Sequence, residues 1–193
     1  MFVLTIDQRR SRRDADRVPD LLAHLATAPV VRAFERAAGN EVQAVLSDAA
    51  SVVSVVLDLV RRTHWSVGIG IGAVEQPLSP RTRAGHGPAL EHARTAVEHA
   101  KSALTHVAVS GFDPAGATAV ATVLDLMALL VQRRSPEGWA AVELLAAGHT
   151  QSSAAEALGV SKQAVSQRLR TTAWQQEQAG RALAATLLTE ADR

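Results

Sequence analysis

The sequence contains no cysteine, which excludes disulfide bonds, thiolate metal sites and cysteine nucleophiles. It also lacks the pattern of a signal peptide, because arginines follow its apolar start at residues 1–7, whereas a signal peptide carries its charge first. The longest strongly apolar stretch, 117–131, is interrupted by Asp125 and is too short for a membrane span. We therefore expect a soluble cytoplasmic protein without a membrane partner.

A strong net charge is missing as well. The 193 residues carry a formal net charge of +1 and are 47% hydrophobic, which is ordinary for one large or two small globular domains. Residues 113–193 hold seven basic and eight acidic side chains, and residues 1–112 hold the other thirteen and eleven. Because neither part is strongly basic, any affinity for nucleic acid must come from a local cluster.

Strand and helix patterns alternate over residues 1–112. Asp16 and Asp48 are placed to cap helices, Gly39-Asn40 is a hairpin turn, and glycine alternates with branched residues in 67–72, which predicts a strand with one side-chain-free, crowded face. The expected order is a strand at 2–6, a helix at 18–27, a hairpin of 30–36 with 42–46, a helix at 49–62, a strand at 67–72, a helix at 88–104 and a strand at 107–109. This order predicts one layered α/β (α+β) domain with an antiparallel hairpin in its sheet.

The pattern becomes purely helical after Gly111. A connecting helix is expected over 113–134, and it is apolar nearly all round, which predicts burial on both sides, either between domains or against a second copy. The next helix begins at Ser135-Pro136 and stops before Gly148. We expect an α/β domain at 1–112, the connecting helix at 113–134 and an all-α domain at 135–193.

Residues 150–174 predict a helix-turn-helix. Thr150 is a good N-cap for a first helix at 151–158, Gly159 tolerates the left-handed turn, and Ser161 caps a second helix at 162–173. The steep crossing needs a small residue at the contact, supplied by Ala154 or Ala155, over a small core of Leu158, Val160, Val165 and Leu169 against Val142 and Leu145.

The second of these helices carries side chains suited to base edges and phosphates. They are Lys162, Gln163, Ser166, Gln167 and Arg170, and no acid lies between Glu156 and Glu177. The run Val165-Ser166-Gln167-Arg168-Leu169 resembles the helix-turn-helix of bacterial regulators and of sigma-factor region 4. The alternative is an ordinary helical hairpin with a solvated polar face.

Helix-turn-helix proteins usually act as dimers on two half-sites, and two segments are candidates for a homodimer interface. One is a last helix with Trp174, Leu183, Leu187 and Leu188, and the other is the apolar helix at 117–131. The alternative is that both complete the core of a monomer.

The strand order, with three local matches, resembles the catalytic domain of nucleotidyl cyclases and GGDEF diguanylate cyclases. Asp7 ends the first strand where those enzymes keep a metal-binding aspartate, residues 38–42 stand at their Gly-Gly-Asp-Glu-Phe hairpin, and residues 67–72 with 89–94 and Ala100-Lys101 look like their glycine-containing strand and following helix. With a trailing helix-turn-helix, the arrangement looks most like SatD-type bacterial proteins. The resemblance implies a ferredoxin-like, cyclase-like sheet.

The chemistry of such an enzyme needs two carboxylates to hold divalent cations. Here the second position is the neutral Asn40, and its neighbour Glu41 is expected to point to the other face of the strand. We therefore expect a degenerate site with no catalytic residue, no metal and no cofactor. A nucleotide or phosphate could still be held by Asp7, Asn40, Glu41 and the loop arginines Arg9, Arg10, Arg12 and Arg13. The alternative is that these arginines form an ordinary solvated basic loop.

Other enzyme signatures are lacking: neither a Ser-His-Asp arrangement nor a P-loop occurs. His92, His99 and His106 are spaced by seven, which on a helix is too far for one ion, about 10 Å. We expect a DNA-binding bacterial transcriptional regulator that binds double-stranded DNA as a homodimer, with residues 1–112 as a sensor for a nucleotide effector or as an assembly module. The alternatives are a residual cyclase using Asp7 and Glu41, and a ligand-binding or interaction module that never touches DNA.

Overall fold

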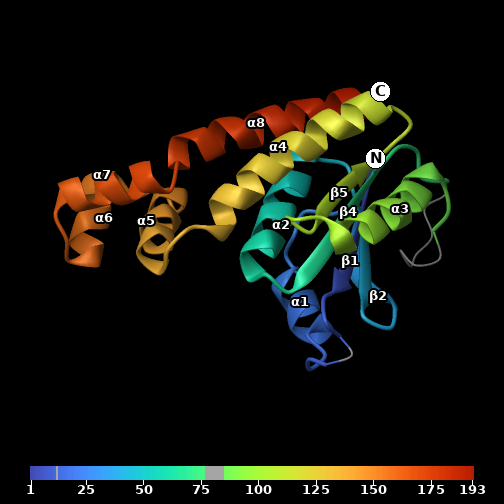
Figure 1. The fold of residues 1–193 in the computed structure, drawn as a ribbon, viewed down its shortest axis with the longest axis horizontal. Coiled ribbons are helices and arrows are strands. Elements are labelled where there is room, and N and C mark those ends of the chain that lie inside the picture. Colours follow the sequence, from blue (N-terminus) through green and yellow to red (C-terminus); the bar gives the residue numbers. More distant parts are fainter. Residues whose placement is uncertain (12, 77–84) are drawn as a thin grey trace.

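The computed structural model describes residues 1–11, 13–76 and 85–193. A five-stranded sheet carries helices on both faces (Figure 1). A helical arm, formed by the three helices within residues 136–171, projects from one side. The elements are β1 (Phe2–Gln8), α1 (Val18–His24), β2 (Arg32–Ala38), β3 (Glu41–Leu46), α2 (Ala49–Arg62), β4 (Trp65–Ile71), α3 (Pro88–Ser102), β5 (Val107–Ser110), α4 (Pro114–Gln132), α5 (Pro136–Ala146), α6 (Gln151–Leu158), α7 (Lys162–Thr171) and α8 (Trp174–Ala191). The predicted element order and the mixed α/β class are confirmed.

The sheet has the strand order β2-β3-β1-β4-β5. β1 lies in the centre and pairs antiparallel with β3 and β4, whereas β5 runs parallel to β4. In this register Asp7 lies opposite Glu41 of β3 and Ser66 of β4. The end of β1 therefore meets the starts of β3, β4 and β5 at one edge of the sheet.

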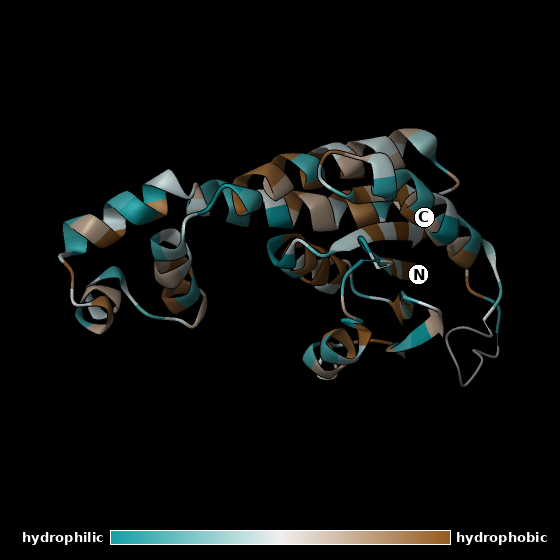
Figure 2. Cartoon of the chain, turned by 60° about the horizontal axis from the view of Figure 1, so that its bottom comes forward, coloured by the Kyte–Doolittle hydropathy of each residue, from teal (hydrophilic) through white to brown (hydrophobic). Residues whose placement is uncertain are grey.

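The two faces of the sheet are packed differently. Alternate β1 residues such as Leu4 and Ile6 enter the main core, which includes the valines of α2 and residues of α4 and α8. Apolar residues gather where α4 lies over the sheet (Figure 2). The opposite face is covered by α3, and a Cβ built on Gly68 would stand 2.2 Å from the Val97 nitrogen, while one on Gly70 would stand 2.0 Å from the Ala89 carbonyl oxygen. The prediction of a side-chain-free strand face is confirmed.

Two local expectations are corrected. Asp16 accepts a hydrogen bond from the Val18 amide at 3.0 Å, but Arg17 is the N-cap of α1, and the helix ends at His24 rather than 27. β1 runs one residue beyond Asp7, because Gln8 still pairs with Trp65.

The connecting helix α4 differs most from its prediction. Burial on both sides is wrong for a single chain, because the Leu126 side chain is 60% exposed. The expectation that the stretch is too short for a membrane is also wrong by length and composition alone, since α4 has 19 residues of high hydropathy. However, Val120, Leu124 and Ala128 are fully buried in the main core. This is the behaviour of a core helix that keeps one open face.

A buried ion pair joins the helical arm to the rest of the chain. Glu177, at the start of α8, is 1% exposed and accepts hydrogen bonds from Arg134, after α4, and from Arg181. Arg134 also donates to the Thr172 carbonyl oxygen at 3.2 Å. Its guanidinium carbon lies 4.3 Å from the centre of the Trp139 ring, and the guanidinium carbon of Arg61, from α2, lies 3.9 Å from that centre. The arm is thus fixed by contacts to both α4 and α2.

We expect Gly70→Ala to be strongly destabilising, because the new methyl group would strike the α3 backbone, which cannot move aside cheaply. The loss in free energy of unfolding should be about 1–3 kcal/mol or more. Gly180→Ala is the matched control, since its methyl group would meet only the flexible end of Met127, at 2.9 Å from the sulfur. It should change stability by less than about 1 kcal/mol in urea denaturation. Equal effects would contradict the packing described for α3.

Removing one partner of the buried Arg134–Glu177 pair should lower the free energy of unfolding far more than removing both partners. Arg134→Met leaves the Glu177 carboxylate buried beside only the partly exposed Arg181, and breaking such a pair costs about 3–5 kcal/mol. In Arg134→Met/Glu177→Leu no buried charge is left, so much of the loss should be recovered. Thermal denaturation of both variants checks this, and additive losses would show that the two residues do not act as a pair.

Candidate functional site

The tight turn between α6 and α7 is built from capping residues. The Thr150 hydroxyl accepts a hydrogen bond from the Ser153 amide at 3.1 Å, and the Ser161 hydroxyl accepts one from the Ala164 amide at 3.1 Å. Between the helices Gly159 has φ = 62°, the left-handed conformation that favours glycine. The amide of Val160 donates back to the Ala155 carbonyl at 3.0 Å. The predicted helix boundaries, caps and glycine turn are therefore present.

A separate small core holds α5, α6 and α7 together. Ala154 and Ala155 are buried where α6 meets its neighbours, and Val165 and Leu169 of α7 are buried against Val142 of α5. Leu145, Leu158 and Val160 pack at its margin and are only half-buried. Because the residues on the inner side of α7 pack in this core, the core does not cover the outer side of α7.

The outer face of α7 carries the predicted DNA-contacting residues. Lys162, Gln163, Gln167 and Arg170 are exposed, whereas Ser166 is half-buried. Ser166 and Arg170 also line a hollow of about 390 Å³ beside α8. α7 lies at the far end of the helical arm, away from the sheet (Figure 1). The structure thus presents these side chains together, on an end of the molecule that the α/β domain does not cover.

A second cluster of polar side chains gathers at the end of β1. Asn40 donates a side-chain hydrogen bond to one oxygen of Asp7, and the Lys101 ammonium, at the end of α3, lies 3.1 Å from the other. Glu41 lies directly opposite Asp7, so the expectation that it points away is wrong: residues opposite each other in antiparallel strands share a face. Burial, and next the charge of Asp7, raise the pKa of Glu41. Asp7, Asn40 and Glu41 are therefore brought together.

The arginines that follow β1 line a pocket of about 520 Å³. Arg9, Arg10 and Arg13 contribute to it, while Arg12 lies outside the described residues. Asn40 and Glu41 do not line it. Sequence reasoning missed three lining residues, Ser66, Lys101 and His106, which come from other elements. The pairing of β1 with β4 brings Ser66 to this edge, the pairing of β4 with β5 brings His106, and the packing of α3 on β4 brings Lys101.

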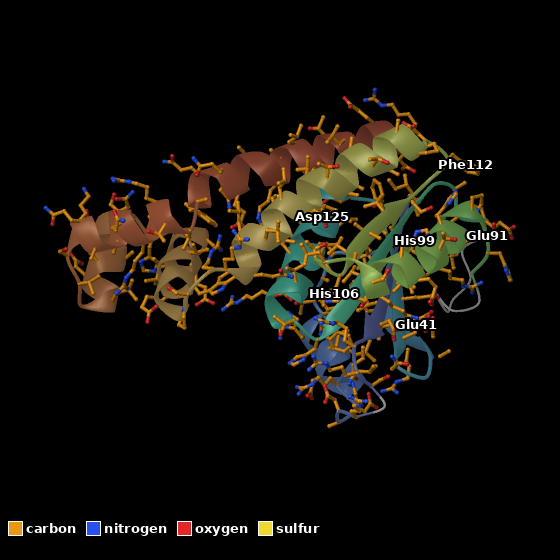
Figure 3. The ribbon with its side chains drawn as sticks, in the orientation of Figure 1. Glu41, Glu91, His99, His106, Phe112 and Asp125 are labelled. Carbon is orange, nitrogen blue, oxygen red and sulfur yellow. The ribbon has the colours of Figure 1, made fainter. Side chains whose placement is uncertain are left out.

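The three regularly spaced histidines form no common site. His92 lies 3.2 Å from the Ser110 hydroxyl through Nδ1 and packs edge-on against Phe112, whereas His106 faces the basic pocket and His99 lies on the exposed side of α3 (Figure 3). In the part of the chain that the structure describes, no three His, Asp or Glu residues gather as metal ligands would.

Comparison with known proteins gives no relative for this chain. No family model, no curated protein and no solved structure matches it.

Proposed function

We propose that the protein is a DNA-binding transcriptional regulator that inserts α7 into the major groove. One observation carries the proposal: a capped helix-turn-helix leaves Lys162, Gln163, Gln167 and Arg170 exposed on one side of α7, at the free end of the arm. Amide side chains pair with adenine edges, and cationic ones pair with guanine edges or phosphates. In the alternative, α6 and α7 form an ordinary helical hairpin whose polar face meets only solvent. The hydrogen-bond donors gathered on α7 would then have no role.

We assign the α/β domain the role of a sensor or assembly module. Its β2-β3-β1-β4 order, with α1 and α2 as crossovers, supports the ferredoxin-like, cyclase-like resemblance and with it the likeness to SatD-type bacterial proteins. We propose that this regulator acts in the cytoplasm. Residual cyclase activity receives no such support. Both oxygens of Asp7 already accept contacts from Lys101 and Asn40, so the carboxylate is not free to hold a metal.

We further propose that the protein binds DNA as a homodimer through the open sides of α4 and α8. The two helices are antiparallel neighbours, since Gly116 lies by Ala191 and Gly180 by Met127. Leu126 of α4 and Leu183 of α8 are 60% and 51% exposed. The exposed positions 115, 118, 122 and 126 of α4 carry no charge. A second copy of this chain would cover that apolar surface and give two α7 helices for two half-sites.

Arg170→Ala should weaken DNA binding, because it removes a cation that reaches base or phosphate. In fluorescence anisotropy with a pool of genomic fragments we expect salt-sensitive binding by the native protein and a loss of about fivefold to 100-fold in the variant. Arg193→Ala is the matched control, because it removes an equally exposed arginine at the opposite end of α8. Equal affinity of all three proteins for DNA would contradict the assignment of α7 as the DNA-contacting helix. Absence of DNA binding by the native protein would contradict the proposed function.

Leu126→Glu/Leu183→Glu should convert the dimer to a monomer, since four charges would face one another across the apolar contact. Light scattering after size exclusion should then give the chain mass of 20.4 kDa instead of twice that value. Leu104→Glu changes a still more exposed leucine, 80% open, on the loop after α3, and should leave the dimer intact. A monomeric native protein, or a dimer unaffected by the double change, would contradict this interface.

A further inference from the structure

The basic pocket lies at the edge of the sheet where four segments meet. Asp7 and Gln8 end β1, Ser66 starts β4, Lys101 ends α3, and His106 precedes β5. Its volume of about 520 Å³ is within the roughly 300–1,000 Å³ of small-molecule sites. It therefore has room for an organic anion and not only for a single inorganic ion.

The side chains that line this pocket carry an excess of positive charge. Among the described residues they include Arg9, Arg10, Arg13 and Lys101, and a single carboxylate, Asp7. Lys101 is paired with Asp7 and Glu98, whereas neither Arg10 nor Arg13 forms an ion pair with any residue that the structure places. Burial, and next the charge of Arg10, lower the pKa of Arg9. The charges of Arg10 and Arg13 are thus not compensated by an ion pair with any residue in 1–11, 13–76 or 85–193.

The far end of the loop that carries the arginines is held by hydrogen bonds to the Gln8 side chain. The Gln8 side chain donates to the Ala15 carbonyl at 2.7 Å and accepts from the Arg17 amide at 2.8 Å, so it ties down the far end of the loop. Arg10 and His106 adopt positive φ angles of 57° and 59°. Non-glycine residues held in this way cost about 1–3 kcal/mol and cluster at ligand sites.

The ammonium group of Lys101 stands where the cyclase resemblance implies a divalent cation. It lies 3.1 Å from Asp7 and 2.6 Å from Glu98, and its hydrogen bond to Glu98 is the main cause that raises its pKa. The remaining Asp7 oxygen accepts from Asn40. A metal ion needs carboxylate oxygens that are free to coordinate it, so the residues present do not fit the implied metal.

We infer that this pocket binds a small ligand bearing a chain of phosphate groups directly on Arg10 and Arg13, without a divalent metal. Guanidinium groups form paired hydrogen bonds with phosphate oxygens, and Arg10 and Arg13 are not held in ion pairs by the residues that the structure describes. This inference names a ligand for the proposed sensor domain. It rests on the proposed sensor role only for what ligand binding does to the function of the protein. Binding itself is measured without DNA, so it can fail or hold independently of the assignment of α7.

Isothermal titration of the full chain with inorganic tripolyphosphate and with GTP, in EDTA and then in Mg²⁺, tests the inference. We expect saturable binding in EDTA that Mg²⁺ does not tighten. Equal affinity of the two probes would mean that phosphates alone are recognised, and tighter GTP binding would add recognition of the nucleoside; both agree with the inference. No binding in EDTA, or binding that requires Mg²⁺, would overturn it.

Two variants locate the ligand. Arg10→Ala/Arg13→Ala should weaken binding of tripolyphosphate at least about tenfold, because two charged hydrogen-bond donors are lost, whereas Arg193→Ala should bind as the native protein does. Lys101→Ala should make binding respond to Mg²⁺, since the freed Asp7 oxygen could then coordinate the ion. Circular dichroism checks that both variants are folded. Native affinity in the double variant would place the ligand elsewhere and overturn the inference.

Discussion

The buried carboxylate of Glu177 is the constraint on which the position of the helical arm depends. It joins Arg134, in the segment that follows α4, to Arg181 within α8. Desolvation makes such a group a poor source of stability, but it permits only the arrangement in which its partners are in place. The direction in which the helical arm leaves the α/β domain is therefore set by charge as well as by apolar packing.

The same joint connects the arm to the layer that covers the sheet. Arg61 of α2 stacks on Trp139 and pairs with Glu143, so α2 contacts α5 directly. α8 returns over α2 and α4 and brings the C-terminus back to the α/β domain (Figure 1). The main core and the small core of α5, α6 and α7 are thus joined by the contacts of Arg61 with Trp139 and Glu143.

Local chemistry made much of the fold predictable from the sequence. Asp48, Thr150 and Ser161 cap the helices that they were expected to cap, and the glycines of β4 lie against α3 as their alternation indicates. These features depend on neighbours within a few residues or on a simple period of two. The face of α7 was predictable for the same reason, because its inner and outer residues follow from helical spacing.

Long-range features were not predictable. The Arg134–Glu177 pair joins residues 43 positions apart, and nothing in the local pattern marks Glu177 as buried. The pairing of Asp7 with Glu41 depends on the hairpin register, and the basic pocket depends on Lys101 and His106 arriving from other elements. For α4, composition alone could not distinguish burial on all sides from one open face, since that depends on where α2 and α8 lie.

Photo-cross-linking from α7 tests most directly the proposal that this helix contacts DNA. A photoreactive side chain at Gln167, on the exposed face of α7, should cross-link to bases of bound genomic DNA, whereas the same group at Thr122, on the open side of α4, should not. DNA that cross-links from neither position, or from Thr122 alone, would contradict the account, because α7 would then lie outside the groove.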